Sequence, residues 1–188
     1  MKIGIVGIGA VGGYISAMLC KSSENVYVIG NGERIDTIKN NGISLKSETV
    51  GTFVAFPTII TEIPKKKKIE LMDIVFVCVK GYSLKEAAKL ISPMVDNHTL
   101  IIPIINDEEG GTELYSYLGK GKVAEGAMYI TSKFEGEGVI NHTSKNTRLV
   151  ISSNKNRPIH KRYLDRVYNV LAKADIMCEV RKGAEAAA

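Results

Sequence analysis

The chain opens with Met1-Lys-Ile-Gly-Ile-Val-Gly-Ile-Gly-Ala-Val-Gly-Gly-Tyr14, and this stretch decides the fold. Apolar residues at positions 3, 5 and 6 predict a short buried strand of a parallel sheet. The spaced glycines Gly7, Gly9 and Gly12 follow at once, and an apolar helical pattern begins behind them. Strand, glycine turn and helix in this order are the context that a dinucleotide-binding fingerprint requires.

Each glycine of this turn has a physical role. Gly7 allows the tight turn out of the strand, Gly9 lets a pyrophosphate approach the backbone, and Gly12 lets the helix pack close to the strand. The first helical turn adds free N–H groups and the positive end of the helix dipole. We therefore expect the pyrophosphate of a dinucleotide to be held by Gly7, Ile8, Gly9, Ala10, Val11 and Gly12.

The second expected strand, over 25–29, ends without an acidic residue. In NAD-binding folds a carboxylate near this position holds the ribose 2′-hydroxyl. Here Asn31 follows the strand, and Arg34 stands beside Glu33 at the start of a helix expected over 33–40. A missing acid with a nearby arginine favours a 2′-phosphate, so the pattern predicts NADP as the cofactor and Arg34 as its ligand, with Asn31 as a further cofactor contact. The alternative is that Arg34 is only a surface residue of that helix.

Two further strands end in polar residues. The apolar run over 72–79, the strongest strand pattern of the chain, ends at Lys80, and a strand over 99–105 ends at Asn106. Ligands of open α/β sheets bind at the carboxyl ends of the strands, so both side chains are candidate cofactor contacts. The alternatives are an ordinary exposed lysine and a helix N-cap.

The remaining pattern completes an α/β chain. Ser83, with Glu86 three residues later, predicts a capping box for a helix over 84–91, and Pro158 predicts the first position of a helix over 158–172. A helix is also expected over 107–118, and strands over 43–46, 51–56, 124–134, 138–142, 147–151 and 176–180. We predict a Rossmann-type, doubly wound and mostly parallel sheet over residues 1–180, with 181–188 as a tail or the start of a second domain.

Composition limits the classes of function. Of the 188 residues, 45% are hydrophobic and 24% are charged, as in an ordinary globular domain. The net charge is +5, but no aromatic residues interleave the lysine run at 65–68, so we expect a solvated loop and no nucleic-acid partner. No stretch approaches the roughly 20 apolar residues that span a bilayer, so no membrane segment is expected.

The cysteines and histidines indicate no metal site. Cys20, Cys78 and Cys178 are far apart and odd in number, which predicts buried reduced thiols and a cytoplasmic protein. Three scattered histidines have no ligand partner at helical or hairpin spacing: His98, His142 and His160. Neither metal binding nor a Ser-His-Asp triad is expected.

Five motifs follow one another along the chain. They are the glycine turn at Gly7, Val79-Lys-Gly-Tyr82, Pro103-x-x-Asn106, Gly126-Ala-Met-Tyr-Ile-Thr-Ser132 and Gly138-Val-Ile-Asn-His142. In this order and spacing they resemble the N-terminal domain of the ketopantoate reductases (2-dehydropantoate 2-reductases) over nearly the whole chain.

The resemblance implies an NADPH-binding Rossmann domain that is followed, in the family, by an all-helical domain. The cleft between the two domains would reduce 2-dehydropantoate to pantoate, a step toward pantothenate. By matching position, Lys80 and Asn106 would face the nicotinamide end of the cofactor, and Ser132 would be a further cofactor contact. The family's proton-donating lysine lies in the helical domain, so the catalytic residues are expected in a domain that is missing from these 188 residues.

Two positions depart from the family's pattern. Asn31 stands where the family often has an arginine for the 2′-phosphate, which leaves Arg34 as its substitute, and Asp107 replaces the usual glycine after Asn106. Another two-domain dehydrogenase of this fold, such as an opine or glycerol-phosphate dehydrogenase, and a non-catalytic nucleotide-sensing module therefore stay open. The expected partner is a small 2-oxoacid substrate, and a homodimer is an open option.

Overall fold

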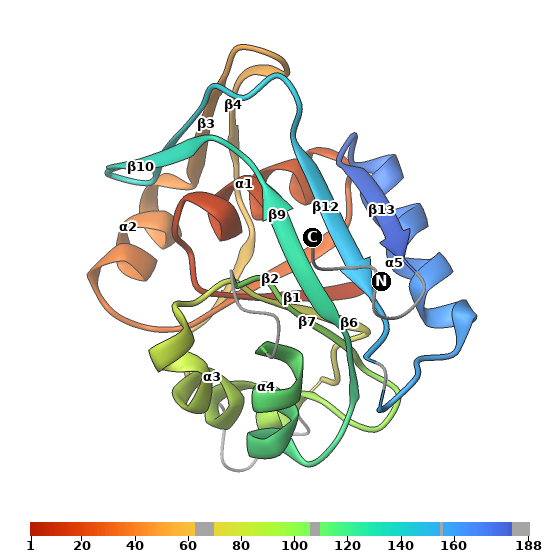
Figure 1. Cartoon of the computed structure of the whole chain (residues 1–188). Coiled ribbons are helices and arrows are strands. Elements are labelled where there is room, and N and C mark those ends of the chain that lie inside the picture. Colours follow the sequence, from red (N-terminus) through yellow and green to blue (C-terminus); the bar gives the residue numbers. More distant parts are fainter. Residues whose placement is uncertain (63–69, 106–109, 155, 182–188) are drawn as a thin grey trace.

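The structure is a computed structural model that describes residues 1–62, 70–105, 110–154 and 156–181. Within these residues, the central sheet has six strands, and every pairing in it is parallel. In order across the sheet they are β5 (Thr58–Ile60), β2 (Asn25–Ile29), β1 (Lys2–Val6), β6 (Ile74–Val77), β7 (Leu100–Pro103) and β8 (Lys122–Val123). From β1 the strands extend outward on both sides, which is the doubly wound sheet that the sequence predicts (Figure 1).

Helices cover both faces of this sheet. They are α1 (Ala10–Lys21), α2 (Glu33–Asn41), α3 (Leu84–Ile91), α4 (Gly110–Leu118) and α5 (Lys161–Lys173), with the short 3-10 helices η1 (Gly81–Ser83) and η2 (Ser92–Met94) flanking α3. In β6, Ile74 and Phe76 belong to the core that contains α1, whereas Val75 and Val77 belong to the core that contains α3 and α4. The strand is therefore buried on both faces, as is usual for parallel sheets.

A second sheet lies over α1. Its strands, in order, are β10 (Ser132–Gly136), β11 (Val139–His142), β3 (Ile43–Ser47) and β4 (Gly51–Ala55). Ile43, Leu45 and Ile140 of this sheet are fully buried in the same core as Ile15 and Leu19 of α1. Helix α1 contacts both this sheet and the central one, so its position is fixed from two sides (Figure 1).

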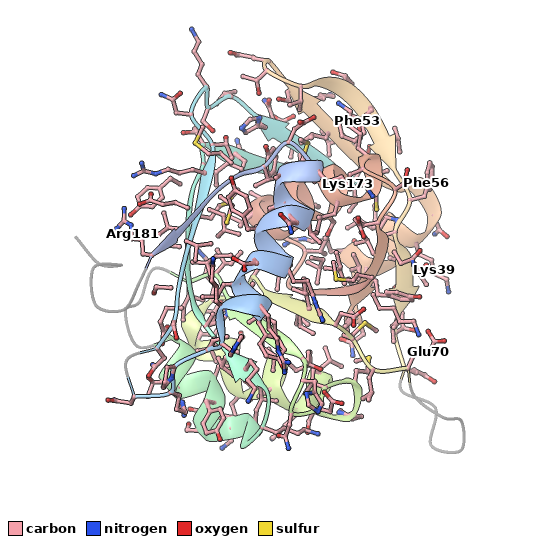
Figure 2. All side chains as sticks on the ribbon, turned by 90° about the vertical axis from the view of Figure 1, so that its right-hand side faces the viewer. Lys39, Phe53, Phe56, Glu70, Lys173 and Arg181 are labelled. Atoms are coloured by element: carbon pink, nitrogen blue, oxygen red, sulfur yellow. The ribbon has the colours of Figure 1, made fainter. Side chains whose placement is uncertain are left out.

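A third sheet packs beside the central one. Its strands, in order, are β13 (Met177–Arg181), β12 (Arg148–Ser152) and β9 (Glu125–Tyr129). Helix α5 connects β12 to its parallel neighbour β13 and buries Tyr163, Val167 and Leu171. Lys173 lies at the last turn of α5 (Figure 2). Its Nζ is 3.0 Å from a carboxylate oxygen of Glu24, and this ion pair ties the helix to the turn before β2.

The expected strand over 124–134 is wrong, because the chain forms two strands there. Tyr129 of β9 pairs with Arg148 in the third sheet, whereas Ser132 of β10 pairs with His142 in the second. The two residues between them carry the chain from one sheet to the other. Because β9 and β10 are both extended, the two-residue alternation of their side chains does not show where the chain passes from one sheet to the other.

One predicted helix start and one predicted cap also differ from the structure, whereas α3 begins at Leu84 as predicted. Helix α5 begins at Lys161 rather than at Pro158, because the Nδ1 of His160 accepts a hydrogen bond from the Arg162 N–H at 3.2 Å and caps the helix there. Ser83 ends η1 and, among the residues that the structure describes, receives no capping hydrogen bond on its side chain, so the predicted capping box is not formed. The helix expected over 107–118 is described from Gly110 onward.

Candidate cofactor-binding site

The turn between β1 and α1 is crowded at two of its glycines. Gly7 has a φ of +87°, and a Cβ on it would lie 2.5 Å from the carbonyl oxygen of Cys78. A Cβ on Gly12 would overlap the carbonyl oxygen of Gly7 and lie 3.2 Å from the Cβ of Cys78. Glycine is required at both positions, one for the tight turn and the other for the close packing of helix on strand.

Gly9, by contrast, faces open space. Among the described residues, apart from its two neighbours in the chain, no heavy atom lies within 4 Å of a Cβ built on Gly9, which directly precedes α1. The first turn of α1 contains no acidic residue, and its leading N–H groups have no acceptor within the helix. The open space therefore adjoins N–H donors and the positive end of a helix dipole, an arrangement that suits a phosphate group.

The other residues of the turn are placed to contribute through their backbones. The side chain of Ile8 is buried in the core, and Ala10 and Val11 are half-buried at the start of α1. Because these side chains are short or turned inward, their main-chain N–H groups are what a pyrophosphate could contact. The turn fits the phosphates of a dinucleotide.

The second sheet holds α1 in this position. A Cβ on Gly13 would lie 2.5 Å from the Cδ1 of Ile140, so glycine lets β11 pack directly on the first turn of the helix. The centroid of the Tyr14 ring lies 4.7 Å from that of His142, also in β11. Neither contact is predicted from the sequence, although the double glycine at 12 and 13 is a signal of a second close approach.

His142 is a structural link between β11, β3 and the loop that follows β11. Its Nδ1 lies 2.8 Å from the Ser47 hydroxyl, and its Nε2 lies 2.6 Å from the Thr147 hydroxyl and 3.0 Å from that of Ser144. Burial lowers the pKa of His142 below its usual value of 6.5, against a smaller opposing effect of the Glu48 charge. The ring is therefore neutral at pH 7.

The predicted 2′-phosphate contacts lie where β2 ends. Asn31 and Arg34 are both exposed, and Arg34 belongs to the first turn of α2. The guanidinium carbon of Arg34 lies 4.2 Å from the ring centroid of Phe134 in β10, a cation–π contact. Phe134 is not a predicted site residue, since no local pattern indicates that a residue so distant along the chain packs on α2.

Lys80 is exposed and lies three residues beyond β6, because that strand ends at Val77 rather than at the predicted residue 79. The Lys80 carbonyl oxygen accepts a hydrogen bond from the Ser83 N–H at 2.8 Å, which closes the turn into α3. The predicted contact Asn106 lies outside the described residues, as does Asp107.

Cys78 lies directly under the glycine turn. Its N–H donates to the carbonyl oxygen of Val6 at 2.7 Å, and burial raises the pKa of its thiol to about 12. Cys20 and Cys178 are also free, and burial raises the pKa of each thiol to about 11. All three cysteines are free, as predicted, but they are half-buried against the core rather than fully buried, and their thiols are protonated near neutral pH.

Ser132 begins β10, beside His142 of β11. Its Oγ is buried and has no hydrogen-bond partner among the described residues. Buried hydroxyls normally have a partner, so this one is a donor and acceptor available to a ligand. By the alternation of β10, Ser132 and Phe134 share the partly buried face of the strand.

Metal-binding clusters and membrane-spanning helices are both absent from the described parts of the chain. No group of three or more His, Cys, Asp or Glu side chains there could hold a metal ion. No helix there is long and apolar enough to cross a membrane.

Comparison with known proteins gives a family match. The family model described as "Ketopantoate reductase PanE/ApbA" matches residues 3–156. The "Uncharacterized oxidoreductase YkpB" of Bacillus subtilis is 29% identical over 150 residues, which are 80% of this chain and 48% of that protein. The 2-dehydropantoate 2-reductase of Aquifex aeolicus is 29% identical over 180 residues, 94% of this chain and 54% of that protein. The chain thus spans about half the length of the curated relatives it matches.

A solved structure shares the fold. The crystal structure of 2-dehydropantoate 2-reductase from Geobacter metallireducens has a TM-score of 0.82 to this chain at 23% sequence identity. The match covers 96% of this chain and 58% of that one. Together with the parallel six-stranded sheet of the described residues, it identifies the fold as Rossmann-like.

Proposed function

Because the chain belongs to the ketopantoate reductase family, we propose that it supplies the cofactor-binding part of an NADPH-dependent 2-dehydropantoate reductase. The observation that carries the proposal is the open space at Gly9, which adjoins the N–H groups at the start of α1. A dinucleotide pyrophosphate has the charge and the size for that position. The family match and the relative in Aquifex aeolicus that is named for this reaction support this substrate class.

The residues of this chain bind and orient the cofactor. When bound, NADPH supplies the hydride that reduces a ketone to an alcohol. The first turn of α1 binds the pyrophosphate, and Arg34 binds the 2′-phosphate through charge-assisted hydrogen bonds. Lys80 contacts the nicotinamide end from the carboxyl edge of the central sheet, and Asn106 and Ser132 are further contacts.

The preference for NADP(H) rests on the charges around the end of β2. Gly30, Asn31 and Gly32 follow the strand, so no carboxylate stands where it would hold a ribose 2′-hydroxyl. Arg34 is exposed in the next turn, and a guanidinium is well suited to a phosphate. Both features favour the phosphorylated cofactor.

Binding of the substrate and protonation of the alkoxide product require groups other than the cofactor contacts named above. Hydride addition to a ketone leaves an alkoxide, and its protonation by a positioned acid typically contributes ~10²–10⁴-fold in rate. Lys80 is assigned to the cofactor. We therefore assign the general acid and the substrate-binding groups to the part of the relatives that this chain does not match.

Two measurements on the 188-residue protein test the proposal. Calorimetric titration should show binding of NADPH, with weaker binding of NADH. Absorbance of NADPH in the presence of 2-dehydropantoate should stay constant. Failure of both dinucleotides to bind would refute the cofactor role, whereas turnover near the ~1–10³ per second of ordinary enzymes would show that the acid lies within these residues.

A further inference from the structure

We propose that Phe134 is a positioning residue for cofactor choice. Its ring holds the guanidinium of Arg34 at the end of β2, ready for the 2′-phosphate of NADP(H). The inference rests on the proposed function and adds a residue that neither the sequence motifs nor the family resemblance indicates.

The two side chains come from a helix and from a strand, and they differ in freedom. Arg34 lies in the first turn of α2 and is exposed, whereas Phe134 lies in β10 and packs against the large hydrophobic core. The core contacts limit the motion of the ring, and the guanidinium carbon lies 4.2 Å from its centroid. The long, flexible side chain is thus stacked on a comparatively fixed surface.

The location matches the position of the adenine ribose. Helix α2 follows β2 through Gly30, Asn31 and Gly32, and β2 is the direct neighbour of β1 in the central sheet. Figure 1 shows α2 and β10 on the same side of the molecule as the turn between β1 and α1. In a doubly wound fold, the group that distinguishes a ribose 2′-hydroxyl from a 2′-phosphate lies at the end of this second strand.

Stacking leaves the binding groups of Arg34 available. A cation–π contact uses the flat face of the guanidinium, whereas its N–H donors lie in the plane and point outward from the edges. Phosphate oxygens can accept hydrogen bonds from those edges while the face stays on the ring. The ring of Phe134 therefore reduces the freedom of Arg34 before binding without competing for its donors.

The charge of Arg34 is also available. Within the described residues, no carboxylate forms an ion pair with Arg34, although Glu33 is its neighbour in sequence. Elsewhere on the surface, Arg181 lies 2.7 Å from a carboxylate oxygen of Glu179. A stacked arginine without an acidic partner suits an incoming anion, whereas an arginine paired with a carboxylate would have to exchange one anion for another.

The test compares NADPH and NADH affinities of variants of the whole 188-residue chain. Phe134→Leu should weaken NADPH binding about two- to fivefold, the equivalent of an exposed cation–π contact, and should leave NADH binding unchanged. Phe134→Tyr keeps an aromatic face and should keep the wild-type ratio of affinities. In an Arg34→Ala background, Phe134→Leu should have no further effect on that ratio.

A matched control exists in the same sheet. The Nζ of Lys21 lies 5.0 Å from the ring centroid of Phe53 in β4, which Figure 2 labels. Phe53→Leu removes the same group from a second cation–π pair of this sheet. This variant should leave the ratio of NADPH to NADH affinity unchanged.

Three results would overturn the inference. If Phe134→Leu weakens both cofactors equally, the ring supports only the fold. If Arg34→Ala lowers NADPH affinity and Phe134→Leu does not, Arg34 binds the phosphate unaided, and the proposed function stands without this inference. If the wild-type chain binds neither dinucleotide, the proposed function fails and the inference fails with it.

Discussion

The carbonyl oxygen of Gly7 occupies the volume that a Cβ on Gly12 would need. The end of β1 and the first turn of α1 therefore meet through two residues that have no side chains. This contact sets the spacing of strand and helix, and with it the shape of the turn at Gly9 between them.

Gly12→Ala should destabilise the protein by about 1–3 kcal/mol, because the added methyl group forces the helix away from the backbone of the turn. Urea unfolding of the wild type and the variant measures the difference. Gly9→Ala is the matched control, since its Cβ would lie within 4 Å of no heavy atom in the described parts of the chain beyond its two neighbours in sequence. It should change the free energy of unfolding by less than about 0.5 kcal/mol. Equal losses in the two variants would mean that crowding is not the cause.

Gly9→Ala should instead impair cofactor binding. The methyl group would stand in the open space that we assign to the pyrophosphate. Loss of a charged hydrogen bond there corresponds to ~1.5–3 kcal/mol, or about 10- to 150-fold in the dissociation constant of NADPH. Calorimetric titration of the folded variant measures it, and unchanged affinity would show that the phosphates bind elsewhere.

Stability should fall in mild acid because of His142. Burial holds its pKa below the usual 6.5, so below that value the unfolded state binds more protons than the folded state. The contribution of the neutral ring is fully present above about pH 6.5 and is lost as the pH falls through the lower, folded-state pKa. Urea unfolding between about pH 5 and pH 8 should show this slope, and His142→Gln should reduce it. A slope that persists unchanged in the variant would assign the effect to other groups.

Lys80→Ala should weaken NADPH binding about tenfold, the equivalent of roughly 1.5 kcal/mol, with little change in thermal stability. The side chain is exposed, so its removal costs little packing. Lys89→Ala, which removes an exposed lysine of α3, controls for the change in net charge and should bind NADPH as the wild type does. Equal weakening in both variants would indicate a general effect of charge rather than a contact.

The fold could be predicted where the signal is local. The apolar strand, the crowded glycines and the helix behind them are contiguous, and the structure has each of them as expected. The start of α5 at Lys161 is not predicted, because a histidine cap gives a weaker sequence pattern than the proline at position 158. The change of sheet between Tyr129 and Ser132 depends on strands that come later in the chain, which no local period encodes.

The candidate site also has a part that the local sequence predicts and a part that it does not. The residues of the glycine turn are adjacent in sequence, so the spacing of the glycines is enough to predict that they bind phosphate together. Phe134 and Arg34 meet only because the second sheet folds back over α1 and brings β10 to α2. Tertiary contacts of this kind follow from the completed fold and not from any stretch of residues.

The packing of Ile140 on Gly13 has a consequence for local opening of the structure. Because β11 lies directly on the first turn of α1, the hairpin of β10 and β11 cannot detach without uncovering the helix that begins the phosphate site. A ligand bound at that helix then favours the closed hairpin by mass action. The backbone amides of β10 and β11 should therefore exchange with solvent deuterium more slowly in the presence of NADPH. The slower exchange should include residues of these strands that the ligand does not contact.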